Sequence, residues 1–308
     1  MSQPNSLSYG DNDTFLTEGL DKEAQIEALG NINKKDSDSD GLKDWEEALW
    51  NTDPQDSDTD DDGTKDGEEV ELGRNPTIAG PDDKYQDDPI IRKANPNVSN
   101  ELLSETDKFS QDFLQNYLSL YDSNGPLNEN DKNNLINISI EDIVGKNISI
   151  TNYTQTDLNI SQNIDSVSVK KYGNTLGEII LKHSFETEDE LTIFNRSVTN
   201  DDTREIEKLD PIINGYKNIL KDSLALSVPV DAINEHITFV QSIASVTESI
   251  EGMRVIYTDP VRAIAGIGSY GQSTKSLKDA FDKMGSYFTN KGIIFSKYDK
   301  GYVVVNVI

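Results

Sequence analysis

The sequence predicts a mainly α protein, in which acidic loop repeats precede an all-helical domain that ends in a C-terminal β-hairpin. Three observations predict this fold class. A block of carboxylates repeats at a fixed offset, apolar residues recur at helical spacing beyond residue 101, and the last residues show a strand-like pattern. We divide the 308 residues into a polar N-terminal segment (1–30), two loop repeats (31–78), a linker (79–100) and a helical domain (101–308).

The composition excludes several classes of partner and site. The 56 acidic and 28 basic side chains give a net charge of −28. Nucleic acid is not expected as a partner, because phosphate contacts need clustered Lys and Arg, and anionic lipid is disfavoured for the same reason. The absence of cysteine removes disulfides and thiolate metal sites. No run approaches the ~18 apolar residues that a membrane span needs.

The acidic residues near the N-terminus form an internal repeat. Residues 36–71 hold sixteen acids and two lysines, which is half of the net charge. Counted from Asp36, carboxylates fill positions 1, 3, 5, 9 and 12 of a loop, and glycine stands at position 6. The same positions are filled 22 residues later, counted from Asp58. A solvated acidic linker with chance periodicity does not explain two complete copies at one offset.

This spacing matches the coordination chemistry of calcium. Calcium takes six to eight oxygen ligands at roughly 2.3–2.6 Å, whereas magnesium prefers strict octahedral geometry and keeps its waters. In a curled loop, positions 1, 3 and 5 supply carboxylates, position 7 its backbone carbonyl, position 9 a direct or water-mediated contact, and position 12 a bidentate Glu. Glycine at position 6 permits the sharp turn. We therefore predict two calcium ions, with the candidate ligands Asp36, Asp38, Asp40, Leu42, Asp44 and Glu47 in the first loop and Asp58, Asp60, Asp62, Thr64, Asp66 and Glu69 in the second.

The repeats also carry a family resemblance. The pattern Asp-x-Asp-x-Asp-Gly-x-x-Asp-x-x-Glu, followed by Thr52-Asp53-Pro54 and a second copy, resembles bacterial thrombospondin type 3 repeats over about residues 36–76. That resemblance implies calcium binding in a secreted or surface protein. The order of modules also resembles uncharacterised surface proteins of candidate-phyla bacteria, which implies no known activity.

Two other calcium-binding modules fit these residues less well. An EF-hand has an apolar residue at position 8 and an entering helix, whereas position 8 here is Lys43 or Lys65 and residues 31–35 form a poor helix. A dockerin follows each loop with a full apolar-faced helix, and few residues are available for one before Pro54. A dockerin-like assembly module stays open as an alternative.

Beyond the proline-rich linker the pattern becomes helical. Apolar residues at spacings of three and four predict helices over 102–121, 129–144, 206–220, 233–253 (capped by Asp231) and 260–288. The same spacing predicts helix over 167–185 and 188–198, as two helices or as one interrupted helix. The period changes at the C-terminus, where 293–295 and 302–307 flank Asp299-Lys300-Gly301 and predict a β-hairpin.

Other motifs favour structural roles. Gly266 to Gly271 match Gly-x-Gly-x-x-Gly but lie within a helical pattern, so close helix packing is the preferred interpretation. His183 and His236 lack the spacing of a zinc site and are expected to be structural. Paired carboxylates for glycoside hydrolysis are compatible with so acidic a chain, but no feature selects a pair.

We therefore expect a non-enzymatic, calcium-binding surface or secreted protein, in which the repeats form a metal-rigidified spacer that presents a helical interaction domain. The alternative is a cell-wall-directed hydrolase with a calcium-stabilised accessory segment. Loops without paired helices bind weakly, on the order of 10⁻⁴–10⁻³ M, which suits extracellular calcium. The expected partner is a protein or another cell-surface component, and the export or anchor segment is expected outside this chain.

Overall fold

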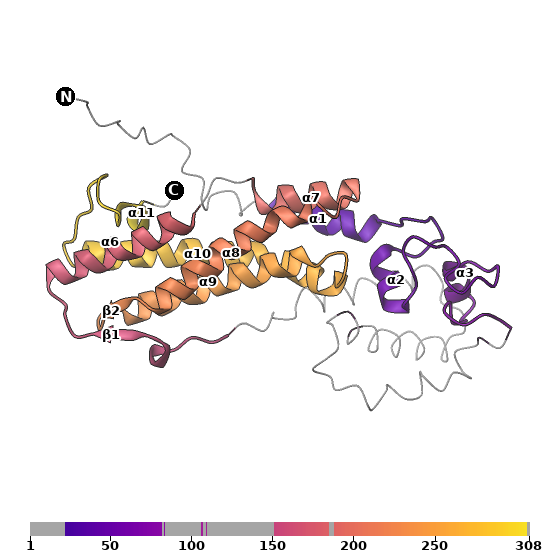
Figure 1. The fold of residues 1–308 in the computed structure, drawn as a ribbon, viewed down its shortest axis with the longest axis horizontal. Coiled ribbons are helices and arrows are strands. Elements are labelled where there is room, and N and C mark those ends of the chain that lie inside the picture. The colour runs from indigo at the N-terminus through magenta and orange to yellow at the C-terminus, as the bar shows by residue number, and fades with distance from the viewer. Residues whose placement is uncertain are drawn as a thin grey trace, which may run out of the picture.

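The computed structural model describes residues 22–81, 83, 106, 109, 151–184 and 188–306, and the fold is mostly helical, as predicted (Figure 1). The predicted helices at 102–121 and 129–144 lie outside these residues, apart from Thr106 and Phe109. The acidic loops lie at one end of an elongated bundle, and two long helices run along its length (Figure 1).

The N-terminal part of the chain contains a helix that the sequence analysis missed. Helix α1 covers Lys22–Lys34 and packs against α7 (Glu190–Asn200) and α10 (Pro260–Asn290). Ala28 and Ile32, one turn apart on the same face, are buried. The expectation of a poor helix over residues 31–35 was therefore wrong, because burial of Ala28 and Ile32 against the bundle stabilises a helix that its own polar sequence does not predict.

A short helix follows each acidic loop. Helix α2 covers Asp44–Trp50 and helix α3 covers Asp66–Glu71. Helix α2 contacts both α1 and α10. Its buried side chains Trp45, Leu49 and Trp50 belong to the same apolar core as those of the bundle. The loops are thus fastened to the helical domain rather than held apart from it.

The bundle confirms the predicted helices between residues 167 and 288. Its remaining helices are α6 (Ser166–His183), α8 (Leu209–Leu224) and α9 (Ile233–Arg254), with short 3₁₀ turns η2 (Gln155–Asp157) and η3 (Ile206–Lys208). Helices α9 and α10 form the most extensive helix pair. A Cβ atom on Gly266 would lie 2.6 Å from the carbonyl oxygen of Ser249, so this glycine lets the two backbones meet. This contact confirms the packing interpretation of the glycine motif.

The one helix cap that the sequence analysis predicted, Asp231, is not the cap that the structure shows. Asp259 caps α10 by accepting the backbone N–H of Arg262 at 3.2 Å. The N-cap of α9 is Ala232 rather than the predicted Asp231. Asp231 instead accepts the Tyr287 hydroxyl at 2.9 Å and pairs with Lys291, so a tertiary contact takes the carboxylate away from the helix end.

The strands lie elsewhere than predicted. Strands β1 (Asn159–Ser161) and β2 (Ser227–Pro229) pair in parallel, with Ile160 opposite Val228. The predicted C-terminal hairpin is wrong, since α11 (Tyr302–Val305) is a helical turn packed on α6 and α10. Val304 is only 1% exposed, and Asn174 accepts the backbone N–H of Gly301 at 2.9 Å. The helical turn is favoured because it buries Val304 against the bundle, whereas a hairpin would leave one face of the valine-rich segment 302–307 exposed.

Candidate metal centre

The two acidic loops repeat in structure as they do in sequence. Position 4 has a left-handed backbone in both, with φ of 63° at Ser39 and 61° at Asp61. Position 6 is also left-handed, with φ of 114° at Gly41 and 93° at Gly63. Because L side chains are strained at such angles, glycine at position 6 relieves a local cost. Each loop therefore curls tightly around one centre.

Backbone donors orient the carboxylates at positions 3 and 5. Asp40 accepts the N–H of Leu42 at 2.7 Å, and Asp62 accepts that of Thr64 at 2.8 Å. One oxygen of Asp38 and one of Asp60 accept the N–H groups of Asp40 and Asp62 in the same way. The second oxygen of Asp38, like that of Asp60, is buried without a hydrogen-bond donor.

The glutamates at position 12 show the same feature more strongly. Glu47 and Glu69 are both 0% exposed, and none of their four carboxylate oxygens accepts a hydrogen bond. Burial without donors is costly for a carboxylate. Desolvation first, and nearby aspartates second, raise the pKa of each glutamate to about 8. A bound cation would remove both penalties, so these orphaned oxygens fit a metal ion.

The remaining donors support a hard, oxygen-binding cation. Within each loop the carboxylate oxygens of positions 1, 3 and 5 lie within 4.8 Å of one another, in the groups Asp36, Asp38, Asp40 and Asp58, Asp60, Asp62. Carboxylates at this spacing match the ligands that hard divalent cations prefer.

The aspartate at position 9 of each loop accepts hydrogen bonds from the residue at position 2. Both oxygens of Asp44 accept hydrogen bonds from the backbone and hydroxyl of Ser37, each at 2.9 Å. Asp66 holds Thr59 in the same way, at 2.9 and 2.7 Å. These two aspartates close their loops, and any contact with an ion through water adds to that role.

Positions 1 and 7 differ between the loops. Asp36 accepts the N–H of Ser39 and lies 3.6 Å from the ammonium group of Lys43, whereas Asp58 accepts two backbone N–H groups. At position 7, where the backbone carbonyl is the predicted ligand, Leu42 buries its side chain in the core and Thr64 does not.

The loops are joined in series through position 5. Asp40 of the first loop accepts the backbone N–H of Gly67 in the second, at 2.7 Å. Asp62 accepts the N–H of Gly80, just beyond the repeats, at 2.8 Å. The backbone N–H of Gly80 therefore contacts the second loop in the same way as the backbone N–H of Gly67 contacts the first loop.

Two residues that contact the second loop, Arg74 and Asp83, escaped the sequence analysis. The guanidinium group of Arg74 lies 3.2 Å from Asp62 and 3.4 Å from Glu69, and it pairs with Asp83. Oxygens of Asp62, Glu69 and Asp83 lie within 4.8 Å of one another. The only available signal was that Arg74 is the first arginine of the chain and comes just after its most acidic stretch, residues 36–71.

Both histidines have protein partners, in keeping with structural roles. His236 is buried, and its Nε2 donates to the carbonyl oxygen of Ser223 at 3.0 Å while its Nδ1 accepts the Tyr172 hydroxyl at 2.9 Å. Desolvation lowers the pKa of His236 to about 4. His183 lies 2.8 Å from Asp222.

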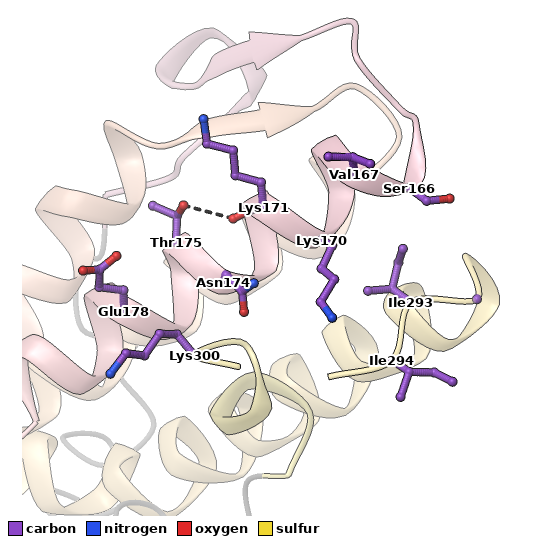
Figure 2. Close-up of a pocket in the computed structure, with 11 residues that line it drawn as sticks. Ser166, Val167, Lys170, Lys171, Asn174, Thr175, Glu178, Ile293, Ile294 and Lys300 are labelled. Atoms are coloured by element: carbon purple, nitrogen blue, oxygen red, sulfur yellow. Dashed lines mark hydrogen bonds between the residues drawn. The ribbon is translucent and has the colours of Figure 1, made fainter. Parts of the chain in front are cut away.

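Two grooves on the described bundle each lack a pair of carboxylates. The larger, of about 580 Å³, lies between α6 and the segment 292–300 (Figure 2). Its rim carries Lys170, Lys171 and Lys300 but only one carboxylate, Glu178. The smaller groove, beside α10 and α11, has Asp282 alone. These grooves lack the facing pair that glycoside hydrolysis uses.

Comparisons of the chain with family models, curated proteins and solved structures gave no match. Among the helices that the structure describes, none is long and apolar enough to cross a bilayer. Fold and site together define a mainly helical protein with paired acidic loops that could hold metal ions.

Proposed function

We propose that the protein binds two calcium ions, one in each acidic loop. The observation that supports this most directly is the buried, donor-free carboxylate at position 12 of both loops, Glu47 and Glu69. Position 3 adds a buried, donor-free oxygen in each loop, and positions 1 and 5 stand close by. A large, hard cation with flexible coordination suits such a set better than magnesium does.

The loaded repeats would act as a rigid extension of the helical domain. Without metal, each loop concentrates carboxylates around a centre with little apolar material to oppose their repulsion. Calcium would neutralise that charge, so that binding and ordering are linked. Because α2 already rests on α1 and α10, the stiffened loops would hold a fixed direction relative to the bundle.

A binding role suits the described surface better than an enzymatic one. The two grooves described above lack a carboxylate pair, so neither of them supports the hydrolase. The apolar side chains of α2 are buried in the protein's own core, which gives a dockerin-like module little free apolar surface on this helix. We propose that the helical domain contacts a protein or another cell-surface component.

The proposed location is extracellular or at the cell surface, and it rests on affinity and on the resemblance of the repeats. Exposed loops of this type bind on the order of 10⁻⁴–10⁻³ M. Extracellular calcium would fill them and stabilise the fold by mass action. Fractionation of the native organism tests this, because recovery from the cytosol alone would contradict it.

Calcium titration of the full chain tests the binding proposal. The protein has two tryptophans, Trp45 and Trp50, both in α2 beside the first loop, so sensitised terbium luminescence complements calorimetry. We expect two sites, of which Glu47→Gln removes the first and Glu69→Gln the second. Glu68→Gln is the matched control, since Glu68 is exposed and adjacent to Glu69. Two intact sites in both Glu47→Gln and Glu69→Gln would contradict the assignment.

A further inference from the structure

The guanidinium group of Arg74 lies where the second loop gathers its negative charge. Its Nη2 atom lies 3.2 Å from Oδ2 of Asp62, which is position 5, and 3.4 Å from Oε1 of Glu69, which is position 12. Its Nη1 atom lies 3.5 Å from the Thr64 hydroxyl, and its Nε pairs with Asp83. Glu69 is fully buried and accepts no hydrogen bond, so its carboxylate faces this cation without being satisfied by it.

In the first loop Lys43 pairs with position 1 and Lys35 with position 9, but no cation of the described residues pairs with Asp40 or Glu47 at positions 5 and 12. The repeat offset places Thr52 opposite Arg74, and both residues donate their backbone N–H to the position 12 carbonyl, at 3.1 Å to Glu47 and 2.8 Å to Glu69. Thr52 and Arg74 therefore occupy equivalent backbone positions, but only the Arg74 side chain carries a charge. Glu47 forms no ion pair with any residue that the structure describes. The loops thus share a backbone and differ in electrostatics.

Asp83 completes this arrangement from outside the repeats. It is 2% exposed, although it lies in the predicted linker, and its carboxylate lies within 4.8 Å of those of Asp62 and Glu69. The corresponding carboxylate near the first loop is the buried Asp66, which belongs to the second loop. Its carboxylate accepts hydrogen bonds from Thr59 and is not paired with a cation among the described residues. Asp83 and Arg74 together are therefore features of the second loop alone.

We propose that Arg74 is the resident cation of a carboxylate site formed by Asp62, Glu69 and Asp83, and that calcium enters the second loop only in competition with it. This inference rests on the calcium binding proposed above. A calcium ion held by Asp62 and Glu69 at roughly 2.3–2.6 Å would lie beside the guanidinium, and the two positive charges repel each other. The first loop should therefore fill at lower calcium concentration, while the second stays partly neutralised and ordered without metal.

The test isolates the second loop in the full chain. In the Glu47→Gln background only the second site remains, and its calcium Kd is measured by calorimetry with Arg74, with Arg74→Gln and with Arg74→Lys. We expect Arg74→Gln to lower that Kd by about tenfold or more, and Arg74→Lys, which keeps the charge, to change it by less than about threefold. Arg204→Gln, at an exposed arginine paired with Asp202 alone, is the matched control and should change nothing.

Hydrogen exchange of the metal-free variants separates competition from a merely structural clamp. Arg74→Gln should exchange faster over residues 73–83 without calcium and regain protection when calcium is added. An unchanged or higher Kd in Arg74→Gln, with calcium binding otherwise intact, would overturn the competition and leave the proposed function standing. Absence of calcium binding in the unmodified chain and in Arg74→Gln alike would overturn both proposals.

Discussion

The ammonium group of Lys35 lies 2.7 Å from Oδ1 of Asp201, which joins the start of the first loop to the end of α7. The same ammonium group lies 2.9 Å from Asp44, the aspartate that closes the first loop. The ring of Tyr257, between α9 and α10, lies 5.8 Å from it. One lysine therefore contacts the loop and two parts of the bundle, and it provides a route by which order in the loop stabilises the helical domain.

Replacing this lysine should weaken the junction. We expect Lys35→Met to lower the free energy of unfolding by about 0.5–1 kcal/mol, because the ion pairs are partly exposed and screened by water. Denaturant unfolding measures the change, and hydrogen exchange near Asp201 locates it. Lys34→Met is the control, since Lys34 is the exposed last residue of α1 and directly precedes Lys35. Equal effects of the two variants would show that the junction depends on other contacts.

The contact between the loops depends on Gly67. Alanine favours a helix over glycine by about 1 kcal/mol, so Gly67→Ala in α3 would stabilise an isolated helix. In the protein a Cβ atom there would lie 2.7 Å from the carbonyl oxygen of Asp40, which the backbone cannot move aside cheaply. We expect a net loss of about 1–3 kcal/mol in stability of the loop segment.

A helical glycine with free space around it provides the matched comparison for Gly67. A Cβ atom on Gly30 in α1 would meet nothing within 4 Å, so Gly30→Ala should gain up to about 1 kcal/mol. Thermal unfolding should show a loss of stability in Gly67→Ala and a gain in Gly30→Ala. A stabilising Gly67→Ala would show that the loops are packed less closely.

His236 should make the protein less stable in acid. Its folded pKa is about 4, below the value of ~6.5 for an unperturbed histidine. Its contribution is therefore fully present above pH ~6.5 and is lost as the pH falls towards 4, since the unfolded chain binds the proton first. The full contribution is on the order of 3 kcal/mol.

The pH dependence of unfolding in two variants isolates the contribution of His236 to stability. His236→Gln should lose the part of the slope between pH 4 and 6.5 that His183→Gln keeps, and an NMR titration of the two histidines should find His236 neutral at pH 5. An imidazole of His236 that titrates near pH 6.5 in the folded protein would contradict the buried arrangement.

Calcium removal should loosen the loops before the bundle. We expect chelation to raise hydrogen exchange over residues 36–72, most strongly in the first loop, where no described cation pairs with the position 12 glutamate as Arg74 does in the second loop. Helices α9 and α10 should stay protected, because their core is apolar and extensive. Tryptophan fluorescence should report the change, since Trp45 and Trp50 lie in α2. Unchanged exchange in both loops would count against linkage between metal and order.

The sequence by itself determined the features that depend on short stretches of chain. The spacing of carboxylates from Asp36 and from Asp58 predicted that positions 1, 3 and 5 gather in each loop, because a loop of this kind draws its donors from neighbouring positions. The helical period likewise predicted α6 to α10, since long amphipathic stretches form the same element wherever their apolar face is buried.

Tertiary structure alone decided the features that join distant parts of the chain. Helix α1 depends on contacts with α7 and α10, and residues 302–305 form a helical turn because Val304 fits into the core. Asp83 reaches the second loop only because the chain folds back after Gly80. Residue type and spacing do not encode such contacts, because the free energy that selects them comes from burial and charge pairing between surfaces that meet only in the folded state.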